Sequence, residues 1–156
     1  MAGTEQMEPV WATGERVAGP RRGLGSPGAN LCIVLLIDTA NVVGSRPTGW
    51  WRDRAGATRL LVDRVRSATA NSQLPRPVVM VLEGVARQGV EEGMADGVEI
   101  VHAPRGGDDT LAGLAEAGGN DVILVSADRA LGERVRHAGG KVVGPSWLLD
   151  RLGPDL

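Results

Sequence analysis

An unbroken apolar segment, residues 31–37, is followed directly by Asp38. A run this short and uniformly apolar is typical of a strand that is buried on both faces, such as the central strand of a parallel sheet. Open α/β sheets bind their ligands beyond the carboxyl ends of such strands. Asp38 therefore stands where a ligand site is expected, although an aspartate at this position can also simply cap the following turn.

The composition fits one α/β domain and excludes several kinds of site. A chain of 156 residues, 42% of them hydrophobic, can bury a sizeable core without disulfides. Because the chain has neither Phe nor Tyr, this core must consist mainly of Leu, Val, Ile and Ala. Cys32 is the only cysteine, which excludes an intramolecular disulfide and a cysteine-based zinc cluster.

Charge and hydropathy indicate a soluble protein without a membrane partner. The net charge of −2 gives no global positive field, so binding to nucleic acid would need a local basic patch. No apolar run approaches the roughly 20 residues that span a bilayer, and the first residues lack the basic and apolar regions of a secretory signal. We therefore expect a cytoplasmic protein, whose oligomeric state the sequence leaves open.

Residues 1–30 differ from the rest of the chain. They show no hydrophobic periodicity and are rich in Gly and Pro, especially over residues 19–28. Such a segment cannot bury enough apolar surface to offset the entropy of ordering it. We expect a disordered leader over residues 1–30 and one folded domain over residues 31–156.

The folded part alternates apolar strands with amphipathic helices. Besides the first strand, we expect strands at residues 78–82, 98–101, 122–125 and 142–143. We expect a loop at residues 42–49, and a loop with a short helix at residues 85–97. Helices are expected over residues 51–70 and from starts near Asp108, Asp128 and Pro145. This rhythm predicts an α/β fold with three layers, α/β/α, around a parallel sheet of about five strands in the order 3-2-1-4-5.

Carboxylates gather at one edge of this predicted sheet. Asp38, Glu83 and Asp128 follow the first, second and fourth predicted strands. Asp108 and Asp109 begin the helix after the third strand. Strands one and four are neighbours whose connections leave in opposite directions, which opens a crevice at their carboxyl ends. Carboxylates that converge there would repel one another and raise each other's pKa. A divalent cation removes this conflict, and oxygen ligands without His or Cys favour Mg²⁺ or Mn²⁺.

Each of these side chains also has a purely structural interpretation. The three later aspartates are placed to cap helices, Glu83 can be an exposed strand end, and Asn41 can hold an Asx turn. Their common location favours a site, because chance caps would be spread over both edges of the sheet. The opposite edge contributes only one carboxylate, Asp121.

Four motifs resemble those of the NYN family of PIN-like nucleases. Residues 38–42 (Asp-Thr-Ala-Asn-Val) resemble the D-x-x-N-V signature at the first strand of that family, and residues 107–109 resemble its acidic pair at a helix start. Residues 126–128 (Ser-Ala-Asp) are similar to its S/T-x-D motif, and Glu83 precedes Gly where many PIN-like proteins carry an acidic residue. The resemblance covers residues 31–152 in order and spacing.

The resemblance implies a ribonuclease that hydrolyses RNA phosphodiester bonds with Mg²⁺ or Mn²⁺ and a carboxylate-held water. The implied catalytic residues are Asp38, Asp108 and Asp128. The implied metal ligands are these three residues together with Asp109 and Glu83. Asn41 and Ser126 would support these ligands. One position departs from the pattern, since Gly132 stands where some relatives carry a further Asp. We therefore expect the site to hold its metal loosely, or to hold one ion rather than two.

The segment after Asn41 combines tryptophan with arginine. An exposed tryptophan can stack the bases of single-stranded RNA while arginines hold its phosphates, and we expect Arg46, Trp50 and Arg52 to bind RNA in this way. The competing interpretation buries one tryptophan as a packing anchor at the helix start. We expect both features, with one tryptophan buried and the other facing the crevice together with Arg46 or Arg52.

Two other functions remain open at this point. A nucleoside-triphosphate pyrophosphohydrolase or another nucleotide hydrolase would also use Mg²⁺ and carboxylates, although the sequence lacks the paired E-x-x-E motifs of the helical type. A non-catalytic PIN-like RNA-binding module would leave the acidic cluster without a use. A phosphatase of the haloacid dehalogenase type is disfavoured, because Ala40 stands where its D-x-D motif needs a second Asp.

Overall fold

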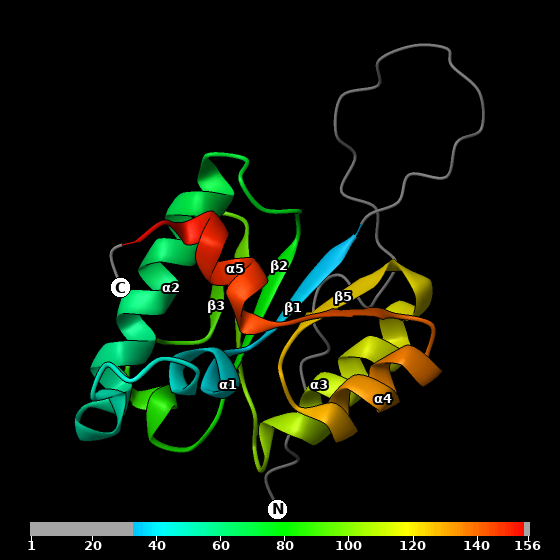
Figure 1. Ribbon diagram of the computed structural model, residues 1–156, viewed down its shortest axis with the longest axis horizontal. Coiled ribbons are helices and arrows are strands. Elements are labelled where there is room, and N and C mark those ends of the chain that lie inside the picture. Colours follow the sequence, from blue (N-terminus) through cyan, green and yellow to red (C-terminus); the bar gives the residue numbers. More distant parts are fainter. Residues whose placement is uncertain (1–32, 155–156) are drawn as a thin grey trace, which may run out of the picture. The chain divides into compact units, whose positions relative to one another are not determined.

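A six-stranded sheet forms the centre of the computed structural model, which describes residues 33–154 (Figure 1). The expected leader, Cys32 and the first residues of the predicted first strand lie outside the described residues. Along the sheet, the strand order is β3-β4-β2-β1-β5-β6; β3 pairs antiparallel to β4, and all other pairs are parallel. The strands are β1 (Val34–Asp38), β2 (Val78–Leu82), β3 (Gly93–Ala95), β4 (Val98–His102), β5 (Val122–Val125) and β6 (Lys141–Val143).

Helices cover both faces of this sheet (Figure 1). Helices α1 (Thr39–Gly44), α2 (Arg54–Ala70) and α5 (Pro145–Leu152) lie on one face, and α3 (Gly107–Gly118) and α4 (Arg129–His137) lie on the other. Short 3₁₀ helices connect the elements: η1 (Trp50–Arg52), η2 (Gly84–Gln88) and η3 (Gly119–Asp121). The three-layer α/β/α arrangement predicted from the sequence is confirmed.

The central strand β1 is buried along its whole length, as the apolar run predicts. Successive side chains of a strand point to opposite faces. Leu35 and Ile37 pack in the core beneath α1, α2 and α5, while Leu36, which is also fully buried, points to the other helical layer. Hydrophobic contacts on both faces therefore fix β1 in the middle of the sheet.

The predicted strand order 3-2-1-4-5 corresponds to β4-β2-β1-β5-β6 and is confirmed. Because these strands are parallel, their carboxyl ends lie at the same edge of the sheet, and the chain changes winding direction between β1 and β5. Among the described helices, none is long and apolar enough to cross a membrane.

The sixth strand, β3, corrects the expectation of a loop with a short helix over residues 85–97. That segment contains η2 and then β3. Asp96 and Gly97 have positive φ angles of 53° and 77°, and they form the two-residue turn that folds β3 back onto β4. The strand lies at the edge of the sheet and is only three residues long, too short for an alternating pattern to reveal it.

Two helix boundaries also differ from the expectation. The first part of the segment expected as a loop, residues 42–44, belongs to helix α1, which begins at Thr39. The helix expected from Trp51 begins at Arg54. Its start is set by Asp53, whose carboxylate accepts a hydrogen bond from the amide three residues later at 2.8 Å, so that η1 and α2 are separate elements.

Candidate active site

Asp38 is the last residue of β1, and only 8% of it is exposed. One oxygen of its carboxylate accepts a hydrogen bond from the amide of Asn41 at 3.3 Å and thereby caps α1. The other oxygen accepts a hydrogen bond from the Ser126 hydroxyl at 2.8 Å. The register explains this contact, because Ile37 is paired with Val125 and the next residue of each strand follows in line.

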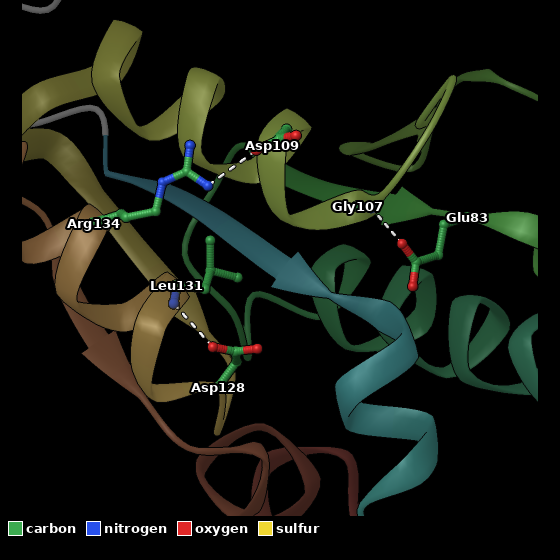
Figure 2. Close-up of polar contacts among 6 residues, drawn as sticks. All are labelled: Glu83, Gly107, Asp109, Asp128, Leu131 and Arg134. Carbon is green, nitrogen blue, oxygen red and sulfur yellow. Dashed lines mark hydrogen bonds and ion pairs between the residues drawn. The ribbon is translucent and has the colours of Figure 1, made fainter.

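A second hydrogen bond joins the β1–α1 junction to the segment before α4, and two local bonds hold that segment. The side-chain carbonyl of Asn41 accepts a hydrogen bond from the amide of Ala127 at 2.8 Å. The Ser126 hydroxyl oxygen accepts another from the amide of Asp128 at 3.0 Å. Asp128 in turn caps α4, where its carboxylate accepts a bond of 2.9 Å from an amide of the first turn (Figure 2). The Ser126 hydroxyl therefore links the Asp38 carboxylate to the backbone amide of Asp128.

A second connection joins β2 to the start of α3. Glu83 follows β2 directly, and its carboxylate accepts a hydrogen bond from the amide of Gly107, the first residue of α3 (Figure 2). Gly107 is buried, and a Cβ atom there would stand 2.9 Å from a carboxylate oxygen of Glu83. The absence of a side chain thus allows the helix start, and with it Asp108, to approach the end of β2.

The two aspartates that follow Gly107 have different surroundings. Asp109 forms an ion pair with Arg134 of α4, at 3.1 Å between a carboxylate oxygen and a guanidinium nitrogen. Its side chain is 85% exposed, and in Figure 2 it points toward Arg134 and away from Glu83. Asp108 instead interacts through its charge with the carboxylates at the ends of β1, β2 and β5. We name the resulting group the acidic cluster: Asp38, Glu83, Asp108 and Asp128.

Burial is the main cause that raises the pKa of the Asp38 carboxyl above its ordinary value of 3.8. The hydrogen bonds from Ser126 and Asn41 lower this pKa, because they favour the ionised form. The negative charges of Asp108 and Glu83 raise it further. The carboxylate is therefore held firmly in place but ionises less readily than it would in water.

The pKa of Asp108 is also raised. Its partial burial at the start of α3 is the largest cause, followed by the charges of Asp128 and Glu83, while the cation of Arg134 acts in the opposite direction. Residues from four separate connections thus repel one another at one edge of the sheet. Such mutual repulsion is a property of sites that bind a cation or handle a proton.

The acidic cluster offers carboxylate oxygens as its donors. All donors are oxygens, which suit Mg²⁺ and Mn²⁺. Within residues 33–154, however, no three or more Asp, Glu, His or Cys side chains are grouped closely enough to hold an ion between them. Mg²⁺ commonly binds through one or two carboxylates and retains several waters, and the separation of these carboxylates fits that mode better than an enclosed cage.

Of the residues expected to bind RNA, Trp50 lines a pocket together with Glu83 of the acidic cluster, and the expected burial of one tryptophan is wrong. Trp50 is only partly buried and Trp51 is 55% exposed, with their rings edge to face at 6.3 Å between centroids. Arg46 and Trp50 line an apolar pocket between α1 and α2. Arg52 is exposed and lines a different pocket together with Trp51.

Two arginines that the sequence did not single out lie closer to the acidic cluster. Arg54 and Arg105 line the same pocket as Glu83, and the guanidinium of Arg54 stands over the ring of Trp50, 5.3 Å from its centroid. The sequence gives no local signal for either arginine, because Trp50 and Arg54 belong to separate elements, η1 and α2, and the turn before α3 places Arg105.

The sheet order, the helical layers and the acidic cluster at the carboxyl edge define a PIN-like α/β/α fold. Among solved structures, the chain is similar to Rae1 (YacP) from Bacillus subtilis, with a TM-score of 0.59 and 18% sequence identity over 76% of this chain and 72% of that one. A tryptophan-to-leucine mutant of the same protein matches with a TM-score of 0.59 and 17% identity, over 76% of this chain and 74% of the other. No family model matches the chain, and no curated protein matches its sequence.

Proposed function

We propose that this chain is a metal-dependent ribonuclease of the NYN type, which hydrolyses phosphodiester bonds of single-stranded RNA. The observation that supports this function most is the acidic cluster, in which carboxylates from four connections converge beside the switch point of a parallel sheet. The four motifs that resemble the NYN family each contribute one member of this cluster. The PIN-like fold agrees with the same assignment.

The chain's own residues would divide the work at this site. Asp38 and Asp108 would hold Mg²⁺ or Mn²⁺ directly, and Glu83 and Asp128 would hold its waters. When bound, the metal would stabilise charge on the phosphate and lower the pKa of the attacking water. Ser126 would keep the Asp38 carboxylate in one orientation through its 2.8 Å hydrogen bond.

Asp108 would act through the ion that it holds, which would carry the attacking water and lower the pKa of that water. It is exposed at the start of α3, so an ion with its waters can reach it. Asp109 is left out of this assignment, because its carboxylate is paired with Arg134 on the outer surface.

Cleavage of end-labelled single-stranded RNA, with and without Mg²⁺ or Mn²⁺, tests the proposal. The decisive variant is Asp38→Asn, and the control is Asp121→Asn, because Asp121 is a carboxylate at the opposite edge of the sheet, at the end of η3 and before β5. Asparagine caps a helix about as well as aspartate, so Asp38→Asn keeps the start of α1. We expect metal-dependent cleavage that Asp38→Asn lowers by at least about 10²- to 10³-fold, the loss seen when a group that stabilises transition-state charge is removed, and that Asp121→Asn leaves intact.

Other results would point to the alternative functions. Release of phosphate or pyrophosphate from nucleoside triphosphates, with RNA left uncut, would establish a nucleotide hydrolase instead. RNA binding without any hydrolysis, and without a rise in melting temperature on adding metal, would establish a non-catalytic module.

A further inference from the structure

A pocket of about 440 Å³ lies directly beside the acidic cluster. We name it the Trp50 pocket; its walls include Ala40, Trp50, Arg54, Thr58, Glu83 and Arg105. Its size falls within the range of small-ligand sites. Glu83 belongs both to this pocket and to the acidic cluster, so an occupant of the pocket would lie next to the site where the phosphate is cleaved.

The walls combine apolar surface with two cations. Trp50 and Ala40 supply apolar surface, against which a nucleobase can pack. Arg54 and Arg105 are both exposed. Arg54 lies over the Trp50 ring, and within the described part of the chain Arg105 has no hydrogen bond or ion pair. A base-sized apolar wall beside two arginines is complementary to a nucleotide with its phosphate.

A second platform continues from this pocket along the surface. Arg54 lines not only the Trp50 pocket but also a neighbouring one, which Trp51, Arg52 and Val85 line as well. Trp51 and Val85 are 55% and 51% exposed. Exposed aromatic rings beside arginines are the common means of holding successive bases of a single strand.

We propose that the Trp50 pocket binds the nucleotide adjacent to the cleaved phosphate, with its phosphate on Arg54 and Arg105, and that Trp51 stacks the base of the next nucleotide. This inference rests on the proposed ribonuclease function and names its substrate more closely. Bases that enter a pocket or stack on a side chain cannot remain paired in a duplex. The substrate must therefore be unpaired over at least the two nucleotides on this side of the cleavage site.

Binding of fluorescently labelled single-stranded RNA, measured by anisotropy in EDTA over a series of salt concentrations, tests this path separately from catalysis. The variants are Trp51→Ala and the double variant Arg54→Gln with Arg105→Gln. The control is Arg136→Gln, which removes an exposed cation from α4, on the other face of the sheet. These side chains are exposed, and a thermal melt of each variant confirms that it folds.

The two kinds of interaction predict different results. Trp51→Ala should weaken binding about tenfold, within the range for removal of a base–aromatic stack, and leave the salt dependence unchanged. The double arginine variant should make the slope of log affinity against log salt shallower, by about 0.7 for each phosphate that the protein no longer neutralises. Arg136→Gln should change neither quantity, and a fully paired RNA duplex should compete poorly with the single strand.

The remaining outcomes decide between the binding path and the ribonuclease function. Unchanged affinity and unchanged salt slope in both pocket variants, with metal-dependent cleavage intact, would overturn the binding path and leave the ribonuclease function standing. Altered binding in these variants, from a protein that never cuts RNA, would overturn the ribonuclease function and leave the path standing. Failure of the wild type to bind single-stranded RNA, or equal affinity for a single nucleoside triphosphate, would overturn the path.

Discussion

Two helices of this chain begin with the same device in different surroundings. Asp38 caps α1 and Asp53 caps α2, each by accepting a hydrogen bond from the amide three residues later. Asp53 is exposed, and within residues 33–154 its carboxylate accepts only that local bond. Asp38 is buried and its second oxygen is held by Ser126, a residue 88 positions away.

The two caps differ in what surrounds their charge. A surface cap such as Asp53 improves folding, because its charge is solvated and complements the helix dipole. Asp38 carries its charge into a buried site among other carboxylates, and its raised pKa shows that the fold disfavours the ionised form. Such an arrangement makes sense where the charge has a use, and substitutions at the two kinds of position can show whether it does.

Asp108 and Asp109 are neighbours in sequence but have different surroundings, and the largest effect is expected from comparing them. We expect Asp108→Asn to lower the kcat for RNA cleavage by about 10²-fold, because it removes a group that acts on the transition state. Asp109→Asn should leave kcat unchanged and cost at most about 1 kcal/mol of stability, the upper value for an exposed ion pair. Steady-state kinetics and urea unfolding of both variants measure these effects. Equal losses of activity would mean that the Arg134 pair belongs to the site.

The hydrogen bond from the Ser126 hydroxyl distinguishes Asp38 from an ordinary helix cap, and removing this hydroxyl is expected to have a smaller effect. Ser126→Ala should lower the apparent metal affinity or the activity by about 10- to 100-fold, as other substitutions behind a ligand do. The control is Ser45→Ala, because the Ser45 hydroxyl also donates a hydrogen bond, at 2.7 Å, but to the backbone carbonyl of Val42. Titration of activity with Mn²⁺ measures both variants, and a normal Ser126→Ala titration would show that Asp38 needs no such support.

The smallest effect is one of stability, and its sign differs between the two caps. The pKa of Asp38 is raised in the folded state, above the ordinary value of 3.8. Between that value and the raised pKa, the folded protein therefore binds more protons than the unfolded chain. The free energy of unfolding consequently falls as the pH rises through this range. Without metal, Asp38→Asn should therefore be more stable than the wild type at pH 7, with a gain that disappears in acid. Asp53→Asn should lose about 0.3–1 kcal/mol of helix-dipole stabilisation at pH 7. Thermal melts from pH 3 to pH 7 measure both, and destabilisation by both variants would reduce Asp38 to a cap.

The parts of the fold that could be predicted from the sequence are those with long apolar patterns. The continuous runs at β1, β2 and β5 identified central parallel strands, and the strand order placed their carboxyl ends together. Helix α1 could not be predicted in the same way, because its six residues carry too little periodicity. Strand β3 was missed for the same reason, although Asp96 followed by Gly97 is a recognised signal for a tight hairpin turn.

For the candidate site, the sequence predicted which residue types would gather but not how each one is oriented. The carboxylates at the ends of β1, β2 and β5 were evident from their positions in the sequence. Which of Asp108 and Asp109 turns toward the other carboxylates depends on Arg134 in a later helix, and no local pattern contains that information. The place of Arg105 beside Trp50 likewise depends on how the turn before α3 packs.

The hydrogen bond between Asp38 and Ser126 also affects when the site can form during folding and synthesis. Because 88 residues separate the two, loop closure on this scale is among the slow steps of folding. During synthesis, Asp38 and Asn41 are complete long before β5 and residues 126–128 have left the ribosome. The site can therefore form only after β5 and residues 126–128 have joined the sheet, so a ribonuclease built in this way would stay inactive as a nascent chain until then.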